Sequence, residues 1–193
     1  MTATAATATA ATADRAALFR RAAGRFPTGV TVVTTLADGE PYGMTANAFM
    51  TLSLDPLLVA VGIGHRARAH GHVLRSGRFA VTVLADHQEP TARRFADPAR
   101  PVGEAAFTAD AWTKGPASGC PVLTDGAAWF DCVVRAAHPA GDHTLVVGRV
   151  ETFGLLDTDR PLLFVNGAFA AAGPALPLGA HPPTRPAPLG ARP

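Results

Sequence analysis

Short runs of β-branched and apolar residues, separated by tight-turn signals, constrain the fold of this chain more than any other feature. Asp38-Gly39, Ala140-Gly141-Asp142 and Asn166-Gly167 are turn sequences typical of β-hairpins. Hairpins join antiparallel neighbours, whereas parallel strands need longer crossovers that usually contain a helix. The chain has no regular strand–helix alternation, and no Gly-x-Gly-x-x-Gly motif follows a predicted strand. The sequence therefore predicts a mainly β, antiparallel barrel with peripheral α-helices rather than a Rossmann domain.

The predicted elements form one domain over residues 14–172. The strand pattern covers residues 28–36, 40–45, 57–63, 79–84, 127–138, 143–155 and 162–165. The helix pattern covers residues 14–25, 67–75 and 87–96, and residues 97–118 read as a long loop. In the first helix the apolar residues recur with helical spacing and form one face, made of Phe19, Ala22, Ala23 and Phe26.

Both ends of the chain have biased compositions. Residues 1–13 are nearly all Ala and Thr, and they lack the basic start and apolar core of a signal peptide. Residues 173–193 are rich in proline. We expect a disordered leader and a disordered tail.

Charge and cysteine content exclude several classes of partner. A net charge of +2 gives no reason to expect nucleic acid, and no apolar run approaches the roughly 20 residues that span a bilayer. Cys120 and Cys132 are too few for a disulfide framework or a structural zinc site, and Cys132 reads as a buried, inert thiol. We therefore expect a cytoplasmic protein that binds neither nucleic acid nor membranes.

The familiar catalytic and metal motifs are missing. The sequence contains no Gly-x-Ser-x-Gly elbow, His-Glu-x-x-His motif or P-loop. His65, His70 and His72 come closest to a metal site. On a helix, however, positions 70 and 72 point to different faces, and no Cys or carboxylate lies close by in sequence. We interpret them as surface histidines and expect no metal.

The most informative stretch runs from Gly43 to Pro56, between two strand-like runs. It contains small residues, hydroxyls and one amide, but little charge. Such a segment lets a ligand lie against backbone N–H groups while Thr and Ser oxygens add hydrogen bonds. On its own it reads as a polar bend between strands, which is a common feature.

Motifs along most of the chain resemble the flavin reductase family, which includes the small reductase components of two-component flavin-dependent monooxygenases. The early ones are Phe26-Pro27-Thr28-Gly29-Val30-Thr31-Val32-Val33-Thr34, Gly43-Met44-Thr45-Ala46-Asn47-Ala48-Phe49 and Ser53-Leu54-Asp55-Pro56. The later ones are Ser76-Gly77-Arg78-Phe79-Ala80-Val81, Gly141-Asp142-His143 and Val147-Gly148-Arg149-Val150. They occur in the family's order over roughly residues 15–170.

This resemblance implies a Greek-key-like, FMN-binding split β-barrel, usually a homodimer. It implies hydride transfer from NADH or NADPH to FMN or FAD, with the reduced flavin passed to a separate monooxygenase. It also implies that the isoalloxazine ring is lined by Thr45, Ala46, Asn47 and Ala48. Ser53 would hold the ribityl-phosphate end, and His143 would lie at the nicotinamide or the flavin edge. Arg66 and Arg68 are the candidates for a phosphate clamp, or else solvated arginines.

Some positions depart from the family pattern. Leu57 follows Pro56 where many relatives have a second proline, Ala69 replaces a common hydroxyl, and Phe169 stands where a tyrosine is usual. These changes leave the choice among FMN, FAD and riboflavin open. Two other functions also stay open: a tightly bound flavin that reduces another acceptor, and a split-barrel protein that binds flavin or haem without turnover.

Overall fold

The computed structural model describes residues 14–174, so the predicted leader and nearly all of the predicted tail lie outside the described residues. Residues 14–23 are helical. The strands that follow are β1 (Thr28–Gly29), β2 (Thr31–Ala37), β3 (Glu40–Ala46), β4 (Phe49–Leu54), β5 (Leu57–Gly64), β6 (Arg78–Val83), β7 (Trp112–Lys114), β8 (Pro121–Leu123), β9 (Ala128–Ala140), β10 (His143–Leu155), β11 (Leu162–Val165) and β12 (Ala168–Ala171). The helices are α2 (Arg68–Ser76) and α3 (Glu89–Ala96), with short 3₁₀ turns η1 (Asp86–Gln88) and η2 (Gly103–Ala106).

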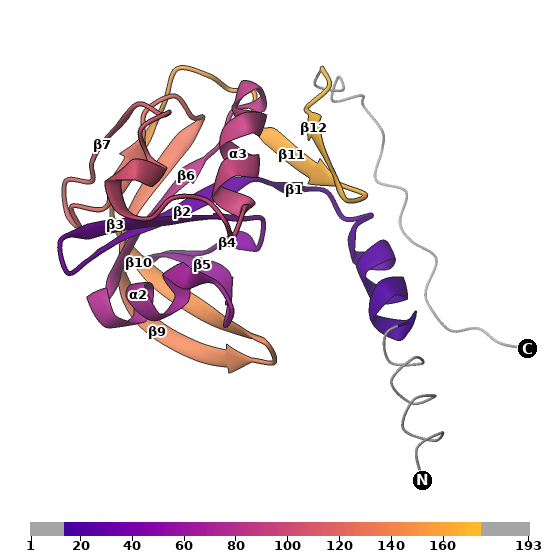
Figure 1. The fold of residues 1–193 in the computed structure, drawn as a ribbon, viewed down its shortest axis with the longest axis horizontal. Coiled ribbons are helices and arrows are strands. Elements are labelled where there is room, and N and C mark those ends of the chain that lie inside the picture. The colour runs from indigo at the N-terminus through magenta and orange to yellow at the C-terminus, as the bar shows by residue number, and fades with distance from the viewer. Residues whose placement is uncertain (1–13, 175–193) are drawn as a thin grey trace, which may run out of the picture.

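A seven-stranded sheet in the order β3-β2-β6-β9-β10-β5-β4 forms the body of the molecule (Figure 1). Every neighbouring pair in it is antiparallel. Its two edge strands, β3 and β4, are consecutive in sequence, so the sheet must curl until both edges meet at the link between them. The mainly β, antiparallel fold predicted from the hairpin signals is confirmed. Among the described residues the strand pairing stays open at β3 and β4, as in a split barrel.

The predicted strand over residues 28–36 is interrupted at Val30. The Val30 N–H donates to the carbonyl of Leu162, and the Val30 carbonyl accepts from the N–H of Leu84. Before this point β1 pairs with β11, in a second sheet of order β1-β11-β12, and after it β2 pairs with β6. One continuous β-rich run therefore serves two sheets.

The prediction of a polar bend from Gly43 to Pro56 is wrong in its extent. Only Asn47 and Ala48 interrupt the strands, and Phe49–Leu54 form β4. This edge strand is largely exposed on both faces, so no alternation of buried and exposed residues marks it. Strands β7, β8 and β12 were missed as well, because segments of three or four residues are too short to show a period.

The predicted helices within the domain are confirmed as α2 and α3. Gly77 ends α2 in the left-handed conformation at φ 67°, the backbone state that favours glycine. Pro90 lies in the first turn of α3, where its missing N–H has no helical partner. Both helices contact β3, but they cover opposite faces of the sheet, α2 on the face of Tyr42 and α3 on the face of Gly43 and Thr45 (Figure 1). No helix of the described part is long and apolar enough to cross a membrane.

The core fills the curl of the sheet. Val33, Val61, Phe79 and Val146 are fully buried in one cluster together with Cys132. Burial, aided by the charge of Asp131, raises the pKa of the Cys132 thiol to about 12. Cys132 is therefore a buried, inert thiol, as the sequence predicts.

Gly148 on β10 tests how tightly this core packs. A Cβ at Gly148 would lie 2.7 Å from Cε1 of the buried Phe79 ring and 3.1 Å from Cβ of Cys132. We expect Gly148→Ala to lower the free energy of unfolding by about 1–3 kcal/mol, because the ring has no room to move away. Denaturant unfolding measures the difference. In the control Gly29→Ala, the added Cβ meets no atom within 4 Å, and equal losses for the two variants would contradict this packing argument.

Candidate active site

The bend Asn47–Ala48 is held at both ends by hydrogen bonds to neighbouring strands. The Thr31 hydroxyl donates to the carbonyl of Ala46 at 2.7 Å, and the Gly62 N–H of β5 donates to the carbonyl of Ala48 at 2.8 Å. A Cβ at Gly62 would lie 3.0 Å from that of Ala48. The small residues therefore let β5 approach the bend closely, while Asn47 and Ala48 themselves stay exposed.

A cavity of about 170 Å³ opens beside the bend. Thr45 and Asn47 line it together with four residues from other elements: Val30, Ala96, Phe164 and Phe169. The two Phe rings meet edge to face at 5.5 Å between centroids, and they give the cavity an aromatic wall. Of these four residues, the sequence drew attention to Phe169 alone, as the departure from a usual tyrosine. Val30 was noted only as part of the first motif, and Ala96 and Phe164 carried no signal, because only the fold brings these residues beside the bend.

Thr45 has a structural partner as well as a place in this wall. Its hydroxyl donates to the carbonyl of Ala92 in α3 at 2.6 Å. The hydroxyl proton is thereby committed, and the oxygen keeps its two acceptor lone pairs. Thr45 thus fixes α3 over β3 and can offer a ligand only an acceptor.

The two predicted clamp arginines lie just beyond the end of β5 that contacts the bend. Arg66 is exposed in a turn closed by the bond from the Ala67 N–H to the Gly64 carbonyl, at 2.9 Å. Arg68 begins α2, and the residue before it, Ala67, provides no side-chain cap. The first N–H groups of α2 therefore face outward together with Arg68, an arrangement that favours anions.

His143 lies at the same end of β5, because it opens β10 opposite Gly64. Its Nδ1 lies 2.8 Å from the carboxylate of Asp142, and this hydrogen bond lowers the pKa of Asp142 below its usual value. A Cβ at Gly64 would lie only 3.4 Å from His143 Nε2. The half-exposed ring therefore lies against the backbone of Gly64, which precedes Arg66 by two residues.

Two histidines share one hydrogen-bond partner, Thr144, the residue next to His143. Thr144 Oγ1 is 2.8 Å from Nε2 of His70 and 3.2 Å from Nε2 of His65. His72, by contrast, stacks on Tyr42 with 3.5 Å between ring centroids. These contacts show that His70 and His72 are half-buried rather than surface histidines. Within residues 14–174 no three metal-binding side chains gather at one place.

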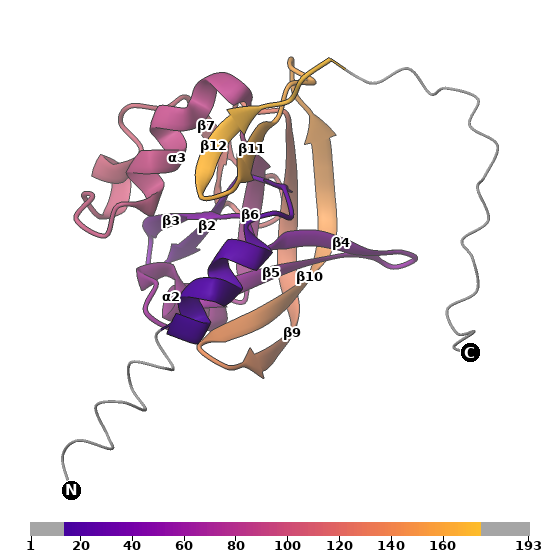
Figure 2. The same cartoon turned by 90° about the vertical axis from the view of Figure 1, so that its right-hand side faces the viewer.

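The structure does not bring Ser53 to the other predicted site residues. Ser53 lies on the β4–β5 hairpin, which projects from the body (Figure 2), and its hydroxyl accepts the Asp55 N–H at 3.2 Å. The length of β4 separates it from Asn47 by about 15 Å. Thr45, Ala46, Asn47 and Ala48 are contiguous, and Arg66, Arg68 and His143 follow or face the same end of β5 that contacts this bend.

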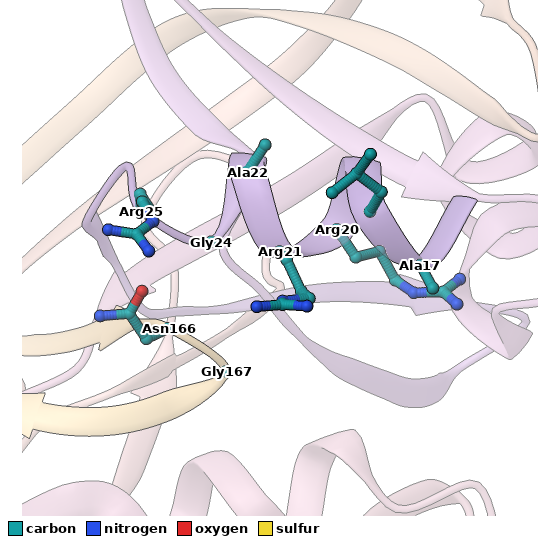
Figure 3. A pocket seen from close by; sticks show the side chains of 9 residues that line it. Ala17, Arg20, Arg21, Ala22, Gly24, Arg25, Asn166 and Gly167 are labelled. Carbon is teal, nitrogen blue, oxygen red and sulfur yellow. The ribbon is translucent and has the colours of Figure 1, made fainter. Parts of the chain in front are cut away.

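A cavity of about 760 Å³ lies elsewhere. Arg20, Arg21 and Arg25 of the N-terminal segment form one wall, and Asn166 and Gly167 of the β11–β12 turn form the other (Figure 3). None of the predicted site residues lines it. Its size comes from the gap beside a helix that stands away from the sheets, so it gives no support to a binding site.

Comparisons with known proteins agree on one family. The flavin reductase like domain matches residues 23–173. An NADH-dependent FAD reductase of Streptomyces globisporus is 41% identical over 155 residues, which are 80% of this chain and 85% of that protein. The flavin-dependent monooxygenase reductase subunit HsaB of Rhodococcus jostii is 39% identical over 158 residues, 81% of this chain and 77% of that protein.

A solved structure gives the same result for the fold. The crystal structure of BorF, the flavin reductase component of a bacterial two-component tryptophan halogenase, superposes with a TM-score of 0.77 at 38% identity. The superposition covers 81% of this chain and 97% of that one. The sequence motifs, the split antiparallel sheet and these matches lead to one conclusion: the chain belongs to the flavin reductase like domain family.

Proposed function

We propose that the protein is a flavin reductase that transfers a hydride from NADH or NADPH to FMN or FAD and supplies the reduced flavin to a separate flavin-dependent monooxygenase. The observation that carries this proposal is the bend at Asn47–Ala48. It presents exposed backbone beside an aromatic-walled cavity, in the motif shared with the family. The relatives named as an NADH-dependent FAD reductase and as a monooxygenase reductase subunit support the reaction and its place beside an oxygenase.

The residues present fit a flavin and a nicotinamide dinucleotide. The two cofactors supply the hydride chemistry themselves when both are bound. Ala48, Gly62 and Gly64 keep the surface flat enough for a ring to approach the backbone. Arg66 and Arg68 supply positive charge for phosphate, and the half-exposed imidazole of His143 can orient a carbonyl or amide at the cleft edge. The protein's task is to orient the two rings and exclude water between them.

We also propose that the protein works as a homodimer, built on an apolar surface that the single chain leaves open. Leu54 at the tip of the β4–β5 hairpin is 87% exposed, and Leu155 at the end of β10 is 88% exposed. Leu57 and Phe153 line one cavity with Leu54 and Ser53 and extend this surface. Exposed apolar area of this extent marks an interface. A second copy on this surface would also lie against Ser53, the one route by which Ser53 could take part in a flavin site.

The reaction takes place, we propose, in the cytoplasm. Cys120 and Cys132 are both buried free thiols, and burial raises the pKa of each. Free thiols in such a fold suit a reducing compartment.

The function is tested by NADH oxidation, followed by ultraviolet absorbance on dialysed protein with and without added FMN or FAD. We expect turnover that requires added flavin. A variant His143→Gln should lower kcat/KM about tenfold, because it loses an imidazole that orients a reacting group. His87→Gln is the matched control, since His87 is similarly exposed and also lies beside an aspartate in sequence.

The outcomes separate the alternatives. A wild-type protein that binds flavin without oxidising NADH would contradict the reductase function and favour a binding protein. A protein that stays yellow after dialysis and ignores free flavin would indicate another acceptor. Equal activities of the His143 and His87 variants would contradict the role of His143 but not the reductase function.

The dimer is tested by sedimentation of the wild type and of a double variant, Leu54→Glu with Leu155→Glu. We expect a dimer for the wild type and a monomer for the variant. In the variant, each subunit would have to bury two charged carboxylates in the dimer contact. Leu74→Glu, at an exposed position on α2, is the control and should sediment as the wild type does. A monomeric wild type would contradict the homodimer.

A further inference from the structure

The N-terminal helical segment, residues 14–23, buries none of its side chains. Every one of these residues is exposed, Phe19 at 72%, and Phe26 just beyond the helix is 75% exposed. The segment, drawn in indigo, stands at the side of the two sheets (Figure 1). Helices in proteins draw most of their stability from the packing of an amphipathic face. The side that carries the two phenylalanines therefore needs a cover, which residues 14–174 of this chain do not provide.

The two sides of this helix face different surroundings. Leu18 and Ala22 line the gap between the helix and the β11–β12 turn, together with three arginines. Phe19 and Phe26 are not among the residues that line this gap. The helix thus turns its aromatic side away from its own subunit, where another molecule can reach it.

An apolar cavity of about 170 Å³ lies on the surface proposed above for the dimer. The β4–β5 hairpin contributes Leu54 and Leu57 to its lining, β9 contributes Phe130, and β10 contributes Phe153. The two rings stack with 6.4 Å between centroids, and Phe153 is 59% exposed. Apolar cavities of about 150 Å³ in proteins bind benzene. This cavity therefore has room for a phenyl ring.

The charges beside the helix and beside the cavity are of opposite sign. Four arginines accompany Phe19 in the N-terminal segment: Arg15, Arg20, Arg21 and Arg25. Asp55 follows Leu54 in the hairpin turn, and Asp157 lies two residues beyond the end of β10. Both aspartates are exposed. Neither they nor the four arginines form an ion pair within the described part of the chain.

A second copy of this chain is the occupant that these observations favour. Each copy carries one such helix and one such cavity, so two reciprocal contacts around a twofold axis close a dimer. The chain's own ends are poorer candidates, because residues 1–13 and 175–193 contain no Asp or Glu that could pair with the arginines. Apolar surface and charge therefore both match another copy.

We propose that the N-terminal helix of each subunit packs onto the other subunit, where Phe19 enters the cavity beside Phe153 and the helix arginines face Asp55 and Asp157. This inference rests on the homodimer proposed above and deepens it, because it names the contact that joins the subunits. Ser53 lines the same cavity. The helix of one subunit would therefore lie beside a predicted cofactor-binding residue of the other.

Cross-linking between two different chains tests this contact. A chain with Phe19→Cys and a chain with Leu57→Cys are co-expressed and treated with a short bis-maleimide. Cys120 and Cys132 are buried, so the reagent reaches the introduced thiols. We expect a covalent dimer on a denaturing gel, above the background of each variant alone. Leu74→Cys in place of Leu57→Cys is the matched control, because both leucines are 38% exposed, and it should give no covalent dimer.

The dissociation constant of the dimer, measured by sedimentation, gives a second readout. Phe19→Ala should raise it roughly 10- to 100-fold, because the dimer loses one buried phenyl ring from each contact. Phe19 is exposed in the single chain, so the variant should fold as the wild type does. Leu74→Ala should leave the dissociation constant unchanged.

The outcomes separate this contact from the dimer itself. A monomeric wild type would contradict the homodimer, and this contact with it. A dimeric wild type without a cross-link above the Leu74 control, and with an unchanged dissociation constant in Phe19→Ala, would overturn the contact alone. A dimer in which the thiol of Phe19→Cys reacts with maleimide only after removal of residues 175–193 would overturn it too, by assigning the cover to the chain's own tail.

Discussion

The hydrogen bond between the Gly62 N–H and the Ala48 carbonyl is the contact on which the site depends. It continues the β4–β5 pairing by one residue, up to the bend that links β3 to β4. Small side chains make this approach possible, because a Cβ at Gly62 would already crowd Ala48. The bend is therefore held against β5 by a contact that only small residues allow.

Local turn chemistry is the part of the fold that the sequence predicts best. Asp38 and Gly39 both adopt positive φ, at 55° and 81°, as do Asn166 and Gly167, at 53° and 78°. Each of these hairpins lies where its turn sequence indicates. The break at Val30 and the edge strand β4 were not predictable in this way, since both depend on partners far along the chain: Leu162 and Leu84 for the former, and β5 for the latter.

The candidate site divides along the same line. Residues in one motif, from Thr45 to Ala48, are contiguous and need no tertiary information to be found together. Phe164 and Ala96 reach the cavity beside the bend only because the fold brings β11 and α3 to it. Ser53 shows the opposite case, in which a residue close in sequence is carried away by a projecting hairpin.

Val30 has a consequence for how this protein opens. Its N–H donates to Leu162 and its carbonyl accepts from Leu84, the Leu162 N–H donates to Leu84 in turn, and the Val30 side chain is 1% exposed. The small sheet and the large sheet therefore share one residue and cannot separate without breaking these bonds. The amide hydrogens of Val30 and Leu84 belong among the slowest in the molecule to exchange with solvent, since their release requires global rather than local unfolding.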